Sequence, residues 1–444
     1  MGGKMKDKVT IDYTTEQKMC VSCGVCAGAC PVRCIEMKLT EKGDAYQPVI
    51  DKEKCIECGK CKRVCPGLGW TVFRKASGNM SEHPELKGEV RKVYTAWLKD
   101  EAMLKQCVSG GCATALITGL LTREIYKKAF LVDSWHIDEK LTARQADAGF
   151  SYGRTAGSRY TPVSQEEAVL YIRKNRNDKV IMVGTACALN GILKVIEEEK
   201  LNRDHYLLIG LFCDKTLNRH MFTYFNHIAE GELSELYYRS KEKKNWPGNV
   251  RLVFRDGGGQ FMPAARRMEV KEYMQLQRCL YCYDKLNESC DLALGDNYTK
   301  KDAWPSGSNS VIIRTGRGEE AFEYVRELLE VKEALYEDVY RSQRMDERRQ
   351  QLQFAAILKR RQGIKLYPEL EYGNISYNRK AEKEYDKRLK KLETGRDFGL
   401  APERLFNYME KEKRKASRNQ KLKKIRGLPK KILKFPGKIV KAGN

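Results

Sequence analysis

Long apolar runs are missing from this sequence. No stretch of its 444 residues approaches the roughly 18 consecutive apolar residues that mark a membrane-spanning helix. The first residues, from Met1 to Lys8, lack the apolar segment of a secretory signal. Histidine is also scarce: the five histidines show no metal-ligand spacing, and no Ser/His/Asp set indicates hydrolysis. We therefore expect a cytoplasmic protein whose chemistry rests on other residues.

Cysteine, by contrast, is plentiful. The chain has sixteen cysteines, and without an export signal they indicate metal ligation in a reducing compartment rather than disulfides. Solvent-accessible iron–sulfur clusters would further indicate an anaerobic or oxygen-avoiding setting.

Eight of these cysteines repeat one spacing pattern. The run C-x-x-C-x-x-C-x-x-x-C-P occurs twice, ending at Cys30-Pro31 and at Cys65-Pro66. It is typical of bacterial ferredoxins, in which the fourth cysteine ligates the other of two [4Fe–4S] clusters. We therefore predict two [4Fe–4S] clusters. The first set of ligands is Cys20, Cys23, Cys26 and Cys65, and the second set is Cys55, Cys58, Cys61 and Cys30.

Structural zinc is the main alternative for this region. Zinc would use Cys-x-x-Cys pairs in two tetrahedral sites, but it has no need of the third cysteine or of the proline. Cys34 lies four residues after Cys30 and does not fit the run, so we interpret it as a small core residue beside the cluster.

The whole chain indicates a multidomain α+β and α/β architecture in four regions. Residues 15–75 form a ferredoxin-type 2[4Fe–4S] domain, and 76–89 form a linker. Residues 90–335 form a central α/β domain. A helical extension follows at 336–410, and residues 411–444 form a basic tail.

Strands and helices alternate in the central region, as in an α/β sheet. The expected strands are Val93–Trp97, Phe130–Trp135, Val180–Gly184, Tyr206–Phe212 and Val311–Ile313, with shorter β segments between Tyr237 and Phe261. The expected helices are Cys112–Thr122, a helix ending near Ile196, Leu217–Ala229 and Glu319–Val331. Ligands bind at the carboxyl ends of strands in such sheets, where Thr185, Cys187 and Cys213 fall.

Four of the remaining cysteines suggest a third metal site. Cys187 and Cys213 each follow a strand, and Cys279-x-x-Cys282 could complete a four-thiolate set; Cys290 is a fifth candidate. We predict a third [4Fe–4S] cluster, with zinc and the absence of any metal as the alternatives.

Several short motifs in this region occur together in one order. They are Ser109-Gly110-Gly111 with Thr114, Gly157-Ser158-Arg159-Tyr160, Val183-Gly-Thr-Ala-Cys187 with Gly191, Gly210-Leu-Phe-Cys213, Arg278-x3-Cys282, Asp291 through Gly295-Asp296, and Thr315 with Gly318. From about Val90 to Gly318 the chain resembles the beta subunit of coenzyme F₄₂₀ hydrogenase/dehydrogenase, a family that is similar to a plant chlorophyll-cycle reductase.

The resemblance implies a flavin domain that binds FAD and exchanges electrons with iron–sulfur clusters. It implies that Ser109, Gly110, Gly111 and Thr114 lie against the flavin nucleotide. Glycines before a helix N-terminus would also let backbone N–H groups approach a pyrophosphate. Ser158, Arg159, Tyr160 and Thr185 are further implied contacts, with Arg159 suited to a phosphate. The family's cluster ligands correspond to Cys187, Cys213, Cys279 and Cys282.

The sequence departs from the family beside these cysteines. The usual Thr-Pro-Cys-Gln has Ala186 and Ala188 here, Cys-His-Gly is Cys213-Asp214-Lys215, and the common Trp after Gly-Asp is Tyr298. The ligands are retained, so the acceptor, and the use of F₄₂₀ itself, are what these changes affect.

The prediction is an FAD- and [4Fe–4S]-dependent oxidoreductase, or its electron-transfer subunit, acting on a deazaflavin-like or other small redox acceptor. We expect a redox partner protein or small-molecule acceptor and a larger oxidoreductase complex. One alternative is an iron–sulfur carrier or scaffold without flavin. Another is an iron–sulfur regulator that binds nucleic acid, which the absence of a helix-turn-helix pattern disfavours.

Positive charge gathers in the tail. From Lys411 onward, 14 Lys and Arg face one acid, Glu412, giving +13 of the chain's net +24. Bulky apolar residues alternate with lysines between Arg426 and Val440, a composition suited to an anionic membrane surface. A solvated, largely disordered extension is the alternative.

Overall fold

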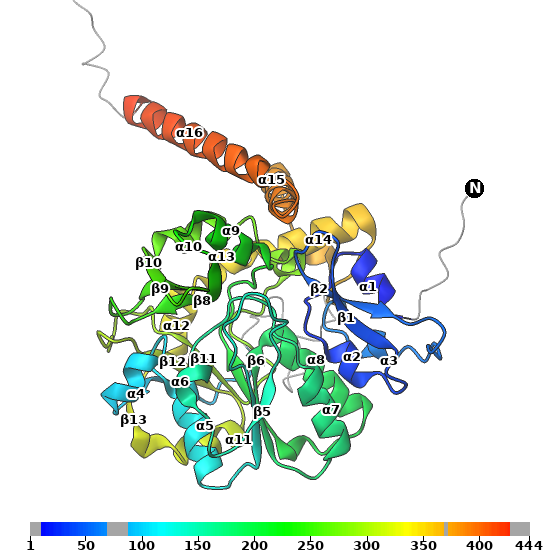
Figure 1. The fold of residues 1–444 in the computed structure, drawn as a ribbon, viewed down its shortest axis with the longest axis vertical. Helices are drawn as coiled ribbons and strands as arrows, with labels where there is room; N and C mark the ends of the chain where they lie inside the picture. The colour runs from blue at the N-terminus through cyan, green and yellow to red at the C-terminus, as the bar shows by residue number, and fades with distance from the viewer. Residues whose placement is uncertain (1–9, 69–87, 368–371, 427–444) are drawn as a thin grey trace, which may run out of the picture.

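An eight-stranded mixed sheet forms the centre of the protein (Figure 1). The computed structural model describes residues 10–68, 88–367 and 372–426. The strand order is β13-β3-β12-β11-β7-β6-β4-β5. The strands are β3 (Lys92–Leu98), β4 (Lys128–Leu131), β5 (Arg144–Ala146), β6 (Val180–Thr185), β7 (Tyr206–Leu211), β11 (Leu292–Asp296), β12 (Asn309–Ile313) and β13 (Leu329–Glu333).

Both faces of this sheet are buried. Strands β4, β6, β7 and β11 are mutually parallel, whereas β12, β3, β13 and β5 add antiparallel edges. Alternate residues of a strand point to opposite faces: Val180 and Met182 belong to one apolar core and Ile181 to the other. Helices α7 (Glu166–Lys174) and α8 (Ala186–Glu198) cover the first face, and α5 (Cys112–Thr122) and α11 (Gly316–Glu323) the second.

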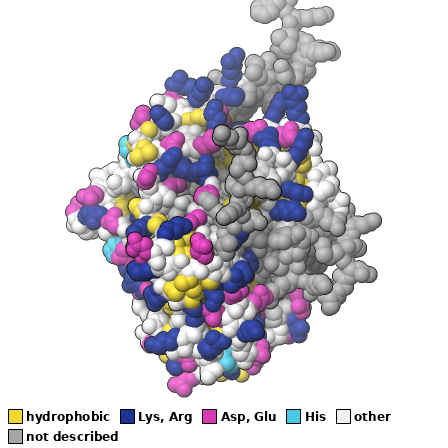
Figure 2. Space-filling model, turned by 90° about the vertical axis from the view of Figure 1, so that its right-hand side faces the viewer, with side chains coloured by type: hydrophobic (Ala, Val, Ile, Leu, Met, Phe, Trp, Pro, Cys, Tyr) yellow, Lys and Arg dark blue, Asp and Glu magenta, His cyan; other side chains and the backbone are white. Residues whose placement is uncertain are grey.

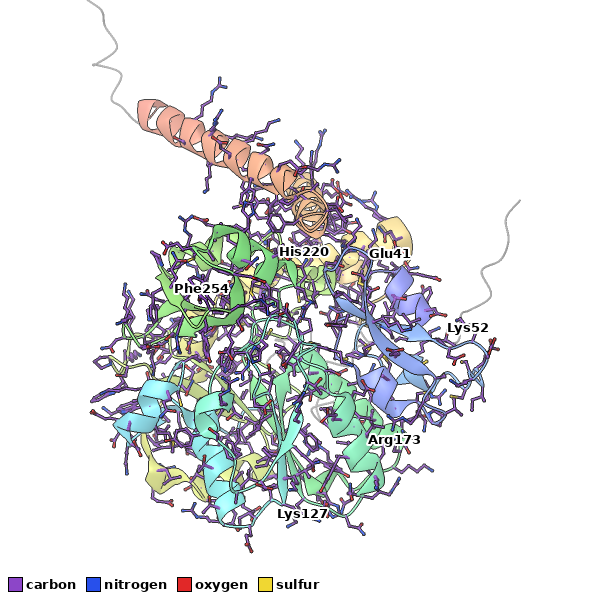
Figure 3. All side chains as sticks on the ribbon, viewed as in Figure 1. Glu41, Lys52, Lys127, Arg173, His220 and Phe254 are labelled. Carbon is purple, nitrogen blue, oxygen red and sulfur yellow. The ribbon has the colours of Figure 1, made fainter. Side chains whose placement is uncertain are left out.

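The N-terminal unit packs against the helices of the first face. It contains α1 (Asp12–Glu16), α2 (Val25–Ala29), β1 (Ile35–Leu39), β2 (Tyr46–Ile50) and α3 (Lys60–Arg63), with β1 and β2 paired as an antiparallel hairpin. On α7, Arg173 donates a 2.9 Å hydrogen bond to the carbonyl oxygen of Gly28 (Figure 3). A Cβ on Gly28 would lie 2.7 Å from the carbonyl oxygen of Glu166, so α2 and α7 touch through their backbones. The unit therefore shares one core with the central sheet.

A smaller sheet stands beside the main one. It consists of β8 (Leu233–Ser240), β9 (Asn249–Phe254) and β10 (Gly259–Met262), as expected for the short β segments of this region. It packs with α9 (His220–Ile228) and α10 (Ala265–Val270); two further short helices are α4 (Glu101–Gln106) and α6 (Tyr152–Thr155).

The C-terminal region is helical, as predicted. Its helices are α12 (Tyr336–Ser342), α13 (Met345–Arg348), α14 (Gln350–Gln362), α15 (Arg379–Arg396) and α16 (Pro402–Arg426). Helix α14 packs with α15 and with the short helix η2 (Gln277–Tyr281), whereas α16 projects away from the body (Figure 1). The basic tail begins inside α16, and its segment 427–444 lies outside the described residues.

None of the described helices is long and apolar enough to cross a membrane. On the face that Figure 2 shows, lysine and arginine side chains are interspersed with aspartate and glutamate. Many of these charges form surface ion pairs, for example Arg63 with Glu198 at 2.6 Å.

Two expectations need correction or comment. The helix predicted for Glu319–Val331 is wrong in its second half: α11 ends at Glu323, and Leu329–Glu333 is strand β13. The edge of β3 offers backbone partners to this segment, a long-range effect that local periodicity does not contain. Most of the predicted linker 76–89 lies outside the described residues.

Candidate functional site: three sets of cysteines around one cavity

The first set of cysteines converges at the inner side of the N-terminal unit. Burial, together with the Cys65 thiol, raises the pKa of Cys20 to about 12 and that of Cys23 well above its usual range. Backbone N–H groups donate to two of the sulfurs, from Ser22 to Cys20 at 3.4 Å and from Gly67 to Cys65 at 3.3 Å. The structure thus brings the fourth cysteine of the second run to the first three of the other, the crossed arrangement that the spacing predicts.

The second set lies nearer the surface. Burial raises the pKa of Cys61, with smaller contributions from the Cys58 and Cys30 thiols. Cys58 is exposed and Cys55 is half-buried. Cys34 is buried here too, with its Sγ 3.5 Å from the Sγ of Cys30 and its N–H donated to the same sulfur at 3.4 Å.

The third set surrounds a small cavity under the C-terminal helices. All four predicted thiols line this cavity, and burial raises the pKa of Cys187 to about 11 and that of Cys282 to about 12. Burial and the other three thiols also raise the pKa of Cys213. Cys290 does not line the cavity: it is 2% exposed, and its thiol donates to the carbonyl oxygen of Asn287 at 3.0 Å.

The donor chemistry of these sets fits iron–sulfur clusters. Four buried thiols that raise one another's pKa need compensating positive charge to exist as thiolates, and iron supplies it. Among residues 10–68, 88–367 and 372–426, no group of three or more His, Cys, Asp or Glu side chains is spaced to hold a single metal ion.

The first and third sets meet at a larger cavity. Its volume is about 320 Å³, within the usual range for cofactor pockets. It lies at the carboxyl ends of β6, β7 and β11, and its wall includes Cys23, Cys187 and Cys213. The Cys187 thiol, after burial and Cys65, contributes to the raised pKa of Cys23, which shows that the two thiols are neighbours.

Seven of the eight residues expected to contact the flavin line this cavity. They are Ser109, Gly111, Thr114, Ser158, Arg159, Tyr160 and Thr185. Gly110 does not line it, because it is packed between strands: a Cβ there would lie 2.6 Å from the backbone nitrogen of Asn309 and 2.7 Å from the carbonyl oxygen of Ala96. At Gly111, φ is +76°, and a Cβ would lie 2.4 Å from Leu98 Cδ1. Close packing thus accounts for both glycines.

Arg159 has a role other than the expected one. Its guanidinium donates four hydrogen bonds of 2.7–2.9 Å to backbone carbonyl oxygens of residues 132, 134, 154 and 157. It also stacks on Trp135, 3.4 Å from the ring centroid. Because most of its donors are occupied, Arg159 holds the cavity wall in place.

Charged residues that sequence reasoning missed also line the cavity. Arg239 Nη1 lies 2.7 Å from Asp296 Oδ2, and this buried pair is supported by Tyr298, whose hydroxyl donates to Asp296 at 2.9 Å. Lys215 and Lys271 line it as well, and burial lowers the pKa of Lys215. The only sequence signal was the departure at Asp214-Lys215, since nothing local marks Arg239.

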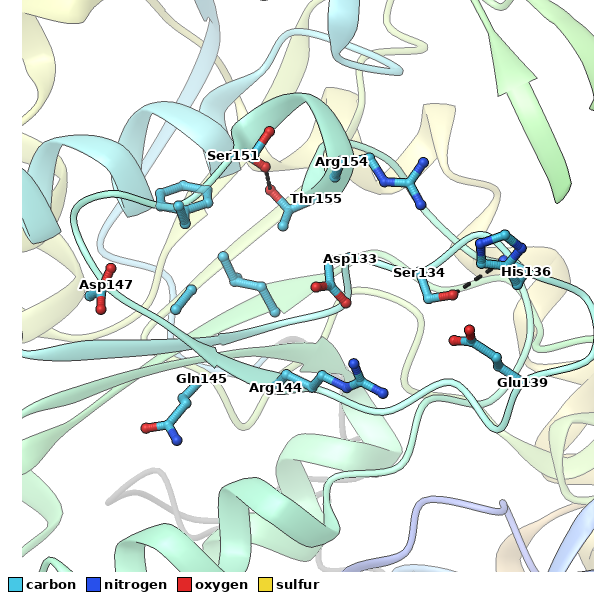
Figure 4. Close-up of a pocket in the computed structure, with 13 residues that line it drawn as sticks. Asp133, Ser134, His136, Glu139, Arg144, Gln145, Asp147, Ser151, Arg154 and Thr155 are labelled. Carbon is cyan, nitrogen blue, oxygen red and sulfur yellow. Dashed lines mark hydrogen bonds between the residues drawn. The ribbon is translucent and has the colours of Figure 1, made fainter.

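A second, open pocket adjoins the cavity. It has a volume of about 440 Å³ and is lined mainly by polar side chains of the segment after β4, of β5 and of α6 (Figure 4). Leu131, Phe150 and Thr155 line both spaces, so the pocket connects the cavity wall with the surface.

The comparisons with known proteins agree with these positions. Residues 19–67 match the family model described as "4Fe-4S dicluster domain", and they include all eight cysteines of the first two sets. The chain is therefore an iron–sulfur electron-transfer protein. Residues 177–337, which include the third set, match the model for the C-terminal part of the beta subunit of "Coenzyme F420 hydrogenase/dehydrogenase". The chain belongs to this family of beta subunits, as the resemblance in the sequence indicated.

One similar curated protein is the F component of the F(420)H(2) dehydrogenase of Methanosarcina mazei, named as one of its subunits. It is 25% identical over 350 residues, which are 72% of this chain and 85% of the relative. One similar solved chain comes from the F₄₂₀-reducing [NiFe] hydrogenase complex of Methanosarcina barkeri. It is 17% identical with a TM-score of 0.46, and the match covers 63% of this chain and 96% of that one.

Proposed function

We propose that the chain is an iron–sulfur flavoprotein that carries electrons between three [4Fe–4S] clusters and FAD. The observation that carries the proposal is the 320 Å³ cavity, which Cys23, Cys187 and Cys213 border together with seven residues expected at a flavin. The first and second sets would hold the ferredoxin-type pair of clusters, and the third set the cluster nearest the cavity.

The bound groups would supply the redox chemistry: clusters exchange single electrons, and a flavin exchanges either single electrons or a pair with hydride. The chain's own residues would provide position and environment. Lys194 donates to the carbonyl oxygen of Cys65 at 3.0 Å, and Gln165 N–H donates to that of Cys23 at 2.7 Å, which fixes the first set against α7 and α8. Arg159 and the Arg239–Asp296 pair would keep the cavity open and shaped.

The acceptor is proposed as a deazaflavin-like or other small redox molecule. The open pocket in Figure 4 gives such a molecule access from solvent to the cavity wall. Since a relative is named as part of a dehydrogenase, we further propose that this chain works in a larger oxidoreductase complex in an oxygen-avoiding cytoplasm. The basic tail would then make contact with a membrane surface.

Anaerobic purification followed by iron, sulfide and flavin assays tests this function. We expect about twelve irons, four for each cluster, and one FAD per chain. Iron without flavin would replace the proposal with an electron carrier or scaffold, and about eight irons would remove the third cluster.

A further inference from the structure

One arginine of the helical extension reaches the third set. Arg348 ends α13, outside the 177–337 segment that matches the family, and its side chain is 7% exposed. Its Nη1 lies 3.2 Å from Asp214 Oδ1, and its Nη2 lies 3.5 Å from the carbonyl oxygen of Cys213. It lines the same small cavity as the four thiols. A residue far along the chain thus completes a site that the central domain supplies.

Arg348 is one of two buried guanidinium groups at this site. Arg278 is 1% exposed, lines the same cavity and donates to the carbonyl oxygen of Gly67 at 2.9 Å. After burial, Arg348 and then Arg278 are the groups that most affect the pKa of Cys282, and both lower it. After burial, the main influences on the thiols of the first set are other cysteines and backbone N–H groups. The third set is therefore the more cationic of the two.

Neutralising Asp214 does not depend on Arg348. Lys271 Nζ already lies 2.7 Å from Asp214 Oδ2, and Asp214 is 40% exposed. A buried guanidinium placed beside a carboxylate that has another partner leaves positive charge facing the thiols.

That charge has a direct electrostatic effect on reduction. A cluster becomes more negative by one unit when it takes up an electron, and a buried cation favours the more negative form because the surrounding dielectric is low. In a transfer between the sets, the cluster at the first set loses one electron and the cluster at the third set gains it. Cations at the third set favour this direction.

We propose that Arg348 raises the reduction potential of the cluster held by the third set, so that electrons arriving through the ferredoxin-type clusters collect beside the large cavity. The inference rests on the proposed third [4Fe–4S] cluster. It assigns to the helical extension a role in setting the direction of electron flow.

Redox titration of the cluster-loaded full chain, followed by electron paramagnetic resonance, tests it. Arg348→Met removes the charge, Arg348→Lys keeps it, and Asp214→Asn removes the opposing charge. Arg341→Met is the matched control, since the Arg341 side chain on α12 is 70% exposed. Signals of the third cluster are identified by their loss in Cys213→Ala.

We expect R348M to make the third cluster at least tenfold harder to reduce at a fixed poise, a fall of about 59 mV for a one-electron couple. R348K should retain most of the wild-type potential, D214N should raise it, and R341M should leave it unchanged. A third-cluster potential that is unchanged in R348M overturns the proposal.

The two proposals fail in different ways. Should R348M lose the third cluster, D214N decides alone: a potential at or below the wild-type value overturns the role of Arg348, and a higher one supports it. Wild-type protein with only about eight irons would instead overturn the third cluster itself, and with it this inference.

Discussion

Arg278 donates its Nε–H to the carbonyl oxygen of Gly67 at 2.9 Å, and this bond joins the two parts of the electron path. Gly67 N–H in turn donates to the sulfur of Cys65 at 3.3 Å, while Arg278 directly precedes Cys279 in the chain. The Arg278 guanidinium also lies over the ring of Tyr367, 5.3 Å from its centroid. The N-terminal unit, the central domain and the helical extension therefore meet around one buried side chain.

Iron content should separate the third-set cysteines from the other buried ones. Cys213→Ala is expected to lower iron from about twelve to about eight per chain, since one cubane holds four irons. Cys290→Ala is the control, because Cys290 is bonded to Asn287 in the core and should keep the full content. Equal iron losses in the two variants would contradict the assignment of ligands.

Docking of the N-terminal unit should be sensitive to a single methyl group. In Gly28→Ala the new Cβ would lie 2.7 Å from Glu166 O and 2.8 Å from Val169 Cβ. We expect a loss of about 1–3 kcal/mol in the free energy of unfolding, measured by anaerobic urea unfolding. Gly373→Ala, with no atom within 4 Å of its Cβ, should change little. Similar losses in the two variants would argue against tight contact between α2 and α7.

The Arg239–Asp296 pair should support both folding and flavin content. Arg239→Met leaves a buried carboxylate without its cation, which costs about 3–5 kcal/mol when one partner of a buried pair is removed. We expect less bound flavin and a lower unfolding midpoint, and partial recovery when Asp296→Asn is added. Arg251→Met, at a side chain 37% exposed, is the control. Unaltered flavin content in R239M would separate this pair from the cofactor.

Mild acid should destabilise the contact between α9 and α15. Burial lowers the pKa of His220, whose Nε2 lies 3.0 Å from the carbonyl oxygen of Arg396 (Figure 3). Because the folded pKa is below the unfolded value of 6.5, the neutral ring stabilises the fold above that pH, and this stability is lost as the pH falls through the folded pKa.

Unfolding followed between pH 7.5 and 5.5 checks this. The wild-type protein should lose more stability than His220→Gln over that range, while His227→Gln, at an exposed ring, should follow the wild type. Parallel curves for the wild type and H220Q would show that His220 does not titrate with folding.

The basic tail is expected to bind anionic vesicles. Each lysine near such a surface contributes about 1 kcal/mol, and segment 427–444 adds apolar residues. Full-length chain should pellet with vesicles that contain phosphatidylserine, and a chain truncated at Lys424 should pellet less. Equal pelleting of the two chains would reject membrane contact.

Local sequence carried much of the fold and of the metal sites. Cysteine spacing predicted the grouping of all three sets, and α5 has the bounds expected from its apolar run, Cys112–Thr122. These features are short-range, so the residues that define them are neighbours in the chain.

What could not be predicted depends on distant segments. Strand β13 forms because β3 has a free edge, and Gly110 is required by β12 and the carbonyl of Ala96. Arg159 looked like a phosphate ligand until four carbonyl oxygens were found around it. Arg348 reaches the cysteines from α13, and no pattern near the cysteines could show that.

The exposure of Cys58 has a consequence for handling the protein. Oxidants attack thiolates that solvent can reach before those that are enclosed, and Cys58 is exposed whereas Cys23 and Cys26 are buried. Brief contact with air should therefore damage the second set first. The remaining chain would keep its inner redox groups and still be cut off from its outside donor, so a loss of activity would precede the loss of most of the colour.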